Sequence, residues 1–287
     1  MQLTLVYKVG RIIPTLFLLL NMTLPTQAQP LQDSLTAYLA RLSETAKVSL
    51  SVKSLTNGNV AFSHHGDERV PSASVIKLPI MLEAMERVKA GTLNLNTIHT
   101  LLNSEKVGGS GKLQNYPDQS RVSYRELLRL MMVKSDNTAT NIFIKLLGRD
   151  AINQRIHTIG LSQSQLNRVM MDTIAARQGR ENYVTAHEMN TLLEKIYWKQ
   201  VATSTLCAEM IDILKQNKDA STIPRLLPKD VAVAHKTGTL AYVRGDAGIV
   251  YAKKPFLLSV FVEGVPTPDA ERIIGEIALI CYNDFSH

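Results

Sequence analysis

Segments with the alternation of β-strands stand near both ends of the chain, and this order limits the available folds most strongly. Val48 to Val52 alternates apolar and small polar residues, which predicts a strand with one buried face. Asn57-Gly58 is a hairpin turn signal, so a second strand is predicted at Val60 to Ser63. Near the other end, strands are predicted over residues 231–236, 247–251 and 256–262. The economical arrangement is one antiparallel sheet assembled from both ends of the chain.

Elsewhere, apolar residues recur at helical spacing. Helices are predicted over residues 31–45, 74–90, 124–133, 138–147, 186–198 and 270–282. We therefore predict an α/β fold, an α+β sandwich, in which an antiparallel sheet from both chain ends is flanked by helices. The middle of the chain would form an all-helical lobe, with the active site in the cleft between that lobe and the sheet.

The first 28 residues have the pattern of a secretory signal peptide. Lys8 and Arg11 supply positive charge, residues 12–20 form a short apolar run, and Thr26-Gln27-Ala28 is a small-residue cleavage site. The run is shorter than the roughly 20 residues of a membrane span. We expect an exported protein, periplasmic or extracellular after cleavage, with no stable membrane span. The alternative is an uncleaved N-terminal anchor.

Residues 29–287 are expected to form a single catalytic domain, because the length and the 45% hydrophobic content suit one sizeable core. The sheet-containing lobe would comprise about residues 29–70 and 215–287, and the helical lobe about residues 71–214.

The formal net charge is +7, but basic and acidic residues are mixed rather than gathered into blocks. Such mixing is typical of solvated helix faces, so we expect no nucleic-acid partner. Seven histidines without HExxH or CxxC spacing predict no metal site. Cys207 and Cys281 lie in apolar helical patterns, and the sequence leaves open whether they form a disulfide or remain two buried thiols.

The first of three chemical motifs is Ser74-Val75-Ile76-Lys77, at the start of a predicted apolar helix. Residues three apart share a helix face, so the Ser74 hydroxyl and the Lys77 amine would lie side by side. A serine hydroxyl needs a base to become a good nucleophile, and a lysine can serve when burial or a nearby positive charge lowers its pKa. Taken alone, the motif is more often an N-capping serine with a surface lysine.

The second motif, Ser135-Asp136-Asn137, lies between two predicted helices. Ser135 can relay a proton to a leaving nitrogen, and Asn137 can hold a substrate amide. Asp136 is expected to tie down the loop. Alone, the run reads as a plain helix N-cap.

The third motif, Lys236-Thr237-Gly238, ends an apolar strand. Lys236 supplies positive charge and Thr237 a hydroxyl for a substrate carboxylate. Gly238 lets a ligand approach the strand closely, and the N–H of Thr239 can donate to an oxyanion. Alone, the run is an ordinary strand end.

Together, the order, spacing and context of the three motifs resemble class A β-lactamases and related penicillin-binding proteins over essentially the whole mature chain. The resemblance implies that a β-lactam or an acyl-D-alanyl peptide acylates Ser74, with Lys77 as general-base candidate and Ser135 as proton relay. It implies an oxyanion hole formed by the N–H groups of Ser74 and Thr239. It also implies a set of substrate-binding residues, namely Asn137, Lys236, Thr237, Gly238 and Thr239.

Arg244 follows the third motif in Tyr242-Val243-Arg244-Gly245. By the same resemblance it would pair with the substrate carboxylate, and the alternative is a surface arginine on a hairpin.

The resemblance breaks in the loop between the second and third motifs, where class A β-lactamases carry a glutamate that activates the deacylating water. Arg168 resembles the arginine that begins this loop, and Asn182 lies where its carboxylate partner is expected. The glutamate position falls on Met170, or on Gln163 in a second register, and neither accepts a proton usefully. Asp172 is the nearest carboxylate. It is either the water-activating base or a brace of the loop.

We predict a class A type serine β-lactamase that hydrolyses the β-lactam amide through an acyl-enzyme on Ser74. One alternative is a D,D-peptidase acting on peptidoglycan stem peptides, which the missing glutamate favours. Another is a non-hydrolytic β-lactam-binding sensor. We expect a monomer without a cofactor, acting on a small-molecule β-lactam or an acyl-D-alanyl peptide.

Overall fold

The computed structural model describes Gln2 and residues 30–287. The predicted signal peptide, apart from Gln2, lies outside the described residues. Within them, none of the helices has the length and apolar character needed to cross a membrane.

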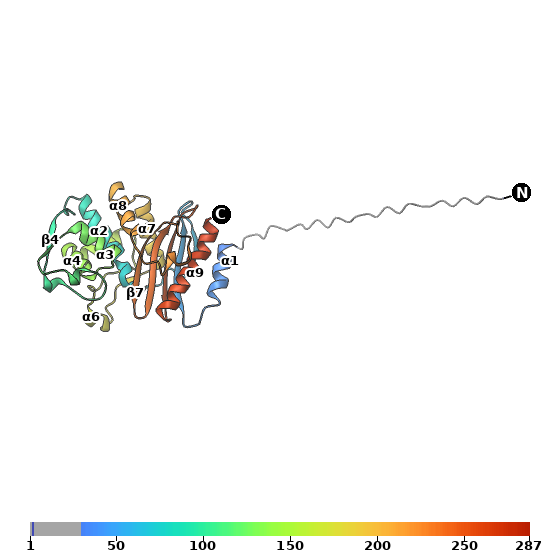
Figure 1. Cartoon of the computed structure of the whole chain (residues 1–287), viewed down its shortest axis with the longest axis horizontal. Coiled ribbons are helices and arrows are strands. Elements are labelled where there is room, and N and C mark those ends of the chain that lie inside the picture. Colours follow the sequence, from blue (N-terminus) through green and yellow to red (C-terminus); the bar gives the residue numbers. More distant parts are fainter. Residues whose placement is uncertain (1, 3–29) are drawn as a thin grey trace.

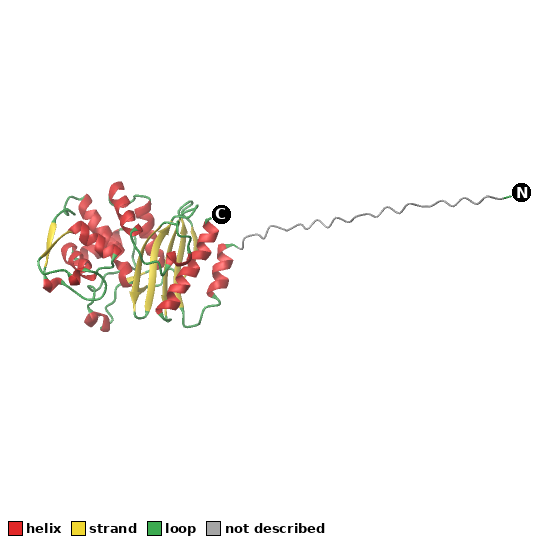
Figure 2. Ribbon diagram, in the orientation of Figure 1, coloured by secondary structure: helices red, strands yellow, loops and turns green. Residues whose placement is uncertain are grey.

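A five-stranded antiparallel sheet forms the centre of one lobe (Figures 1 and 2). Its strand order is β2-β1-β9-β8-β7, so the strand at the amino end, β1, pairs with β9 near the other end. The predicted antiparallel sheet assembled from both ends of the chain is therefore confirmed. The bounds of its strands are β1 Lys47–Ser54, β2 Val60–His64, β7 Val233–Leu240, β8 Val243–Val250 and β9 Phe256–Glu263.

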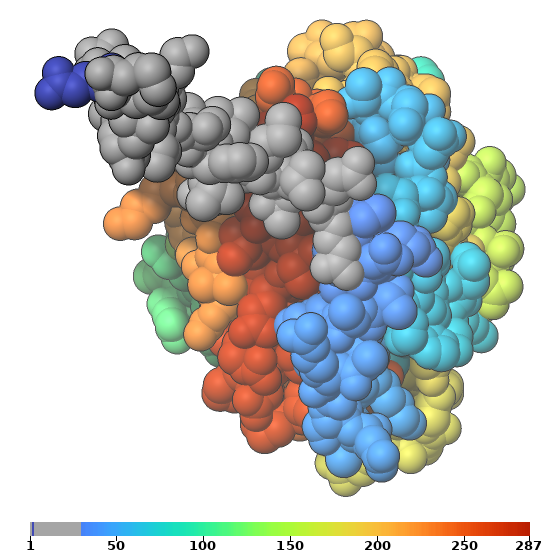
Figure 3. Space-filling view, turned by 90° about the vertical axis from the view of Figure 1, so that its right-hand side faces the viewer, coloured from blue at the N-terminus to red at the C-terminus, as the bar shows by residue number. Residues whose placement is uncertain are grey.

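Two helices cover the outer face of the sheet, α1 (Leu31–Leu39) and α9 (Thr267–Phe285). They lie side by side in the space-filling view, α1 in blue and α9 in red (Figure 3). The hydroxyl of Tyr38 donates to the Glu276 carboxylate at 2.6 Å, which joins the two helices. Apolar side chains of both helices and of the sheet form one buried cluster, which stabilises this layer by the hydrophobic effect.

The inner face of the sheet packs against α7 (Ala186–Tyr197), a helix from the middle of the chain. Asn190 of α7 donates to the backbone oxygen of Ser51 and accepts from the Ser259 hydroxyl, both at 2.8 Å. Because neighbouring residues of a strand point to opposite faces, the Ser259 hydroxyl meets this amide while the apolar neighbours Leu258 and Val260 face α1 and α9. The middle of the chain, predicted to form only the helical lobe, therefore also supplies α7 as the inner layer of the sandwich.

The second lobe is built around α2 (Lys77–Lys89), whose residues from Lys77 to Met85 are all buried. The helices α3, α4, α5 and α8 pack against it. Two short two-stranded sheets accompany the helices here, and the sequence patterns did not predict them. The remaining bounds are β3 Val70–Pro71, β4 Ile98–Leu101, β5 Ser120–Ser123, β6 Tyr183–Val184, α3 Tyr124–Val133, α4 Asn137–Leu147, α5 Arg149–Thr158, α6 Thr173–Arg177, α8 Ser204–Lys215, and the 3-10 helices η1 Ala73–Ile76, η2 Asn103–Glu105, η3 Leu113–Asn115 and η4 Ile223–Leu226.

The two cysteines lie in different helices, Cys207 in α8 and Cys281 in α9. Both are buried free thiols, and the Cys207 thiol donates to the backbone oxygen of Val201 at 2.9 Å. The sequence left open whether the two cysteines form a disulfide, and in the structure they do not.

Candidate active site

Ser74 lies in the short helix η1, which leads directly into α2. The strand β7 is an edge strand of the sheet and passes close to η1. A Cβ atom added to Gly238 would lie 3.0 Å from the backbone nitrogen of Ser74 and 2.9 Å from the Cβ atom of Ala73. Only glycine permits this approach, so the Gly238 position brings the backbone of an edge strand next to the nucleophile.

Lys77 begins α2, and its amine is fully buried beneath Ser74. Its Nζ lies 3.0 Å from Ser74 Oγ, 2.7 Å from the backbone oxygen of Ser135 and 3.1 Å from Asn137 Oδ1. Burial, and secondly the charge of Lys236, hold the pKa of Lys77 well below its usual value. A neutral amine has two N–H donors for the two acceptor oxygens and one lone pair for the Ser74 hydroxyl, so the geometry suits a general base.

The Ser135 side chain connects the first and third motifs. Its Oγ lies 3.1 Å from Lys77 Nζ and 3.2 Å from Lys236 Nζ. Lys236 is also fully buried, and burial lowers its pKa to about 8. Ser135 has a φ of +52°, a left-handed conformation that non-glycine residues seldom adopt and that costs about 1–3 kcal/mol. This backbone turn presents the hydroxyl between the two amines.

Asp136 organises the loop in front of the site. Its carboxylate accepts from the backbone N–H groups of Lys112 at 2.6 Å, Leu113 at 2.9 Å and Ala139 at 2.9 Å. It therefore both ties down the loop, as expected, and caps the amino end of α4. A Cβ atom on Gly111 would come within 2.3 Å of this carboxylate, so the loop needs glycine there.

An ion pair between Arg168 and Glu181 closes the loop after α5, and the sequence had predicted a different partner for Arg168. Asn182 was expected at the partner position of Arg168, but Arg168 donates to both oxygens of Glu181, from Nε at 3.0 Å and from Nη2 at 2.9 Å. An amide has no charge to offer a guanidinium, and the adjacent carboxylate takes that place. Asn182 Oδ1 accepts instead from the N–H groups of Asn167 and Arg168, at 2.7 and 2.9 Å. The Tyr242 hydroxyl lies 3.2 Å from Glu181 Oε2.

Met170 is held beside the site by Asn141 of α4. Its N–H donates to Asn141 Oδ1 at 2.8 Å, and Asn141 Nδ2 donates to the Met170 oxygen at 3.1 Å. Asn141 is one helical turn after Asn137, which contacts Lys77, so both lie on one face of α4. Gln163, the position from the second register, is exposed, and its N–H donates to the buried carboxylate of Glu188. The contacts therefore favour Met170 as the position of the missing glutamate.

Asp172 caps α6. Its Oδ1 accepts from the N–H of Ala175 at 2.9 Å. Of the two roles considered for Asp172, this contact favours the brace of the loop over the base that activates water.

Arg244 lies in β8 opposite Thr239 of β7, and its side chain is buried, which excludes the surface alternative. Nη1 donates to Thr239 Oγ1 at 2.7 Å, and the guanidinium forms ion pairs with Asp219 and Glu271. Thr237 is buried beside Lys236, whereas Thr239 is exposed.

The chain is similar to known proteins over most of its length. The model of the beta-lactamase enzyme family matches residues 30–285. The chain belongs to this family. This β-lactamase family member is 25% identical over 249 residues to the extended-spectrum beta-lactamase PER-1 of Pseudomonas aeruginosa, covering 75% of each chain.

Solved structures show the same fold for this β-lactamase family member. The crystal structure of a beta-lactamase from Sphaerobacter thermophilus superposes with a TM-score of 0.81 at 28% identity, covering 88% of this chain and 97% of that one. The structure of PBP-A superposes with a TM-score of 0.81 at 26% identity, covering 89% and 95%. The predicted fold class is thus confirmed.

Several residues around the site were not singled out from the sequence of this β-lactamase family member. They are Asn141, Glu181, Glu188, Asp219 and Glu271. Glu181 is adjacent to Asn182, the expected partner position of Arg168, so the sequence could have indicated it. The other four lie outside the three motifs, and only the folded chain brings them to the site.

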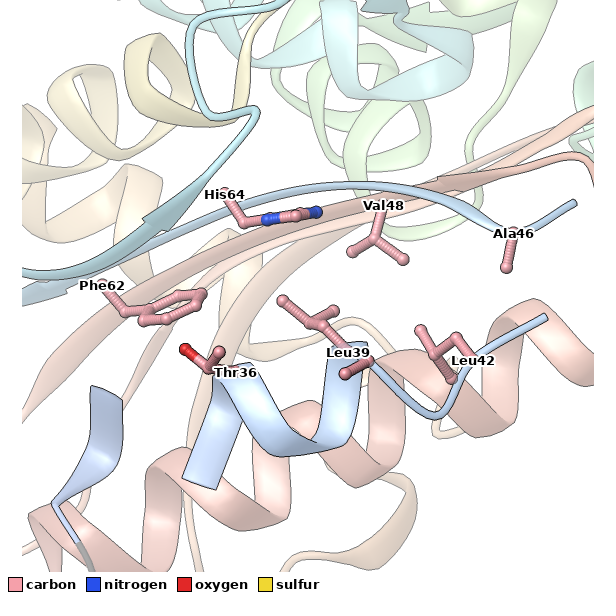
Figure 4. A pocket seen from close by; sticks show the side chains of 8 residues that line it. Thr36, Leu39, Leu42, Ala46, Val48, Phe62 and His64 are labelled. Atoms are coloured by element: carbon pink, nitrogen blue, oxygen red, sulfur yellow. The ribbon is translucent and has the colours of Figure 1, made fainter. Parts of the chain in front are cut away.

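A separate apolar cavity of about 290 Å³ lies between α1 and the first two strands (Figure 4). Leu39, Val48, Phe62 and His64 line it. It contains no nucleophile paired with a base, so the candidate active site remains at Ser74.

Proposed function

We propose that this member of the beta-lactamase family is a serine β-lactamase that opens the β-lactam ring through an acyl-enzyme on Ser74. The observation that carries the proposal is the buried amine of Lys77, 3.0 Å from the Ser74 hydroxyl and with a lowered pKa. Such an amine is neutral at a pH where an ordinary lysine is charged, so it can take the hydroxyl proton.

The proposed acylation uses the groups already described. Ser74 Oγ attacks the β-lactam carbonyl while its proton passes to Lys77 Nζ, and the N–H groups of Ser74 and Thr239 stabilise the oxyanion. When the C–N bond breaks, Ser135 gives its proton to the leaving nitrogen and recovers one from Lys77 through their 3.1 Å contact. The product of this half-reaction is one acyl-enzyme, in which the ring-opened substrate is joined to Ser74 as an ester and carries the new amine. Lys236 and Thr237 hold the substrate carboxylate, and Asn137 holds the amide of its side chain.

All these groups come from one chain, so we propose that the protein acts as a monomer on a small-molecule β-lactam. We further propose export, followed by removal of residues 1–28. The relative PER-1 supports the substrate class through its name.

Time-resolved mass spectrometry of the protein mixed with a penicillin tests the proposal. We expect an adduct of the mass of intact penicillin to appear on Ser74 and then to disappear as hydrolysed penicillin accumulates. The control is Ser74→Ala, which removes one partly exposed hydroxyl and should leave the fold intact while abolishing labelling by a fluorescent penicillin. Labelling that survives in Ser74→Ala would refute the assignment of the nucleophile.

Met170 favours a second candidate function, a D,D-peptidase acting on acyl-D-alanyl peptides. A methionine cannot activate the water that releases the acyl-enzyme. PBP-A, one of the similar structures, has also been solved as a leucine-to-glutamate mutant in an acyl-enzyme complex with penicillin G. An adduct that persists in the same experiment, without hydrolysed product, would support the peptidase.

A further inference from the structure

Met171 is the only exposed methionine among residues 30–287, with an exposed fraction of 47%. The other methionines of this range are all buried, namely Met81, Met85, Met131, Met132, Met170, Met189 and Met210. Both cysteines are buried as well. Because a thioether is oxidised where an oxidant can reach it, Met171 Sδ is the most accessible sulfur in this part of the chain.

The Met171 side chain reaches the loop of residues 108–111, which lies against the site. A Cβ atom added to Gly109 would lie 2.9 Å from Met171 Sδ and 2.8 Å from Asn137 Nδ2. The sulfur and the amide nitrogen therefore border the same space beside the Gly109 backbone. Gly109 has a φ of +80°, a conformation that favours glycine, so no side chain fills this space.

Asn137 has one N–H left for a ligand. Its Oδ1 lies 3.1 Å from Lys77 Nζ, and one N–H of Nδ2 donates to the backbone oxygen of Gly108 at 3.1 Å. A primary amide has two N–H donors. The second N–H of Asn137 has no acceptor within the described residues, so it is the donor available to the side-chain amide of a substrate.

A sulfoxide at Met171 would compete for this donor. A peroxide transfers one oxygen atom to Sδ, which loses two electrons, while the O–O bond breaks and the remaining oxygen leaves with the proton as water or an alcohol. The reaction converts an apolar side chain into a polar, chiral one. Because Sδ and Asn137 Nδ2 border the same space, the oxygen of one sulfoxide epimer can accept the second N–H of Asn137.

We propose that Met171 is a modification site, at which a peroxide forms a sulfoxide that takes the free N–H of Asn137 and slows acylation of Ser74. Only the last step rests on the proposed function, because the position of oxidation requires no substrate. Methionine sulfoxide reductases, one for each epimer, would restore both the thioether and the rate.

Tandem mass spectrometry after timed treatment with hydrogen peroxide gives the order of oxidation. Trypsin cleaves after Arg168 and Arg177, so Met170 and Met171 fall in one peptide whose fragments distinguish them. We expect the sulfoxide at Met171 to form before a sulfoxide at any buried methionine of residues 30–287. Earlier oxidation of a buried methionine, Met170 included, would overturn the assignment of the site.

The second-order rate constant of acylation gives the functional consequence. Penicillin G carries a side-chain amide, whereas 6-aminopenicillanic acid has the same rings with a free amine in its place. Peroxide treatment should lower the rate with penicillin G about fivefold, the usual contribution of one neutral hydrogen bond, and leave the rate with 6-aminopenicillanic acid unchanged. An equal fall for both compounds would mean that oxidation disturbs the loop without competing for Asn137, and it would overturn the inference.

Met171→Leu is the matched control, because leucine keeps an apolar side chain and has no sulfur. Each rate is compared with that of the same protein before treatment. We expect peroxide to change neither rate in Met171→Leu, and the two sulfoxide reductases to restore the rate of treated wild type. A loss in Met171→Leu as large as in wild type would assign the sensitivity to another residue.

Failure of the proposed function has a different signature. Untreated protein would then form no adduct on Ser74 with either compound, while the tryptic peptide would still give the order of oxidation. A normal adduct whose rate does not respond to complete oxidation of Met171 would refute the inference alone.

Discussion

Two buried lysines share one hydroxyl at the centre of the site. Lys77 and Lys236 both lie within 3.2 Å of Ser135 Oγ. Two ammonium groups this close would repel each other strongly in a buried environment, so the pair is more stable with one amine neutral. The pKa of Lys77 is held well below its usual value, whereas the pKa of Lys236 is lowered to about 8. At neutral pH the first amine therefore serves as base and the second keeps its charge.

This division predicts a bell-shaped pH dependence of the acylation rate constant. The rate should rise with pH as Lys77 loses its proton, below the range of an ordinary lysine. It should fall above about pH 8, because Lys236 then loses the charge that attracts the substrate carboxylate. Stopped-flow acylation by a chromogenic cephalosporin from pH 5 to pH 10 measures both limbs.

Lys236→Arg is the control for the falling limb. A guanidinium stays charged over this range, so the limb near pH 8 should disappear while the rising limb remains. A falling limb that persists in Lys236→Arg would assign it to another group.

The central residues of the site could be predicted because each stands in a short motif. Ser74 and Lys77 are three apart where η1 continues into α2, and local geometry alone brings them together. The partner of Arg168 could not be chosen in this way, because Glu181 and Asn182 are adjacent and the backbone path decides which one reaches it. Asp219 and Glu271 belong to no motif at all, and only the folded sheet places them around Arg244.

At the scale of elements, the helix predicted over residues 74–90 is divided, and Pro79 gives the reason. A proline has no N–H to donate to the residue four positions earlier, which is Val75, and its ring crowds that carbonyl. The regular helix α2 therefore starts at Lys77, and the preceding turn is the 3-10 helix η1. By contrast, α3 has its predicted bounds, since Ser123 caps it by accepting from the N–H of Glu126.

The short helix α6 gives a prediction about Asp172. If this side chain is a brace, Asp172→Ala should remove the cap and lower the free energy of unfolding by about 1 kcal/mol, or roughly 2–4 °C in Tm. Asp172→Asn keeps a capping oxygen and should cost little. Calorimetry measures both variants. Slower release of the acyl-enzyme in Asp172→Asn would instead identify Asp172 as the base.

The loop itself gives a prediction about Met170. Its backbone is fixed by Asn141 next to the site, so a carboxylate at this position is well placed to activate water. Met170→Glu should speed release of the acyl-enzyme by up to about 10²–10⁴-fold, the usual contribution of a general base. The decay of the penicillin adduct by mass spectrometry gives the rate.

Met170→Gln is the matched control, because glutamine has the size of glutamate but cannot accept the proton. Release should stay at the wild-type rate in this variant. Equal rates in Met170→Glu and Met170→Gln would show that position 170 does not reach the ester.

At the scale of the whole molecule, strand and helix periodicities predicted which segments form the sheet but not every layer around it. The position of α7 on the inner face involves Asn190, a polar residue that stands out in no local pattern. It bonds the backbone oxygen of Ser51 and the hydroxyl of Ser259 across the interface. The small sheets β3–β6 and β4–β5 are too short to give a periodic signal. Their pairing is determined by the surrounding packing.

The pairing of β1 with β9 also sets an order of events while the chain is being made. β1 and β2 emerge early, but β9, which joins β1 to β8, is the last of the five strands in the sequence. Before β9 is available, β1 and β2 have only each other, and an isolated two-stranded hairpin is marginally stable in water. The centre of the sheet therefore cannot close until Phe256–Glu263 has been made. Until then the sheet remains in two separate pieces, β1 with β2 and β7 with β8.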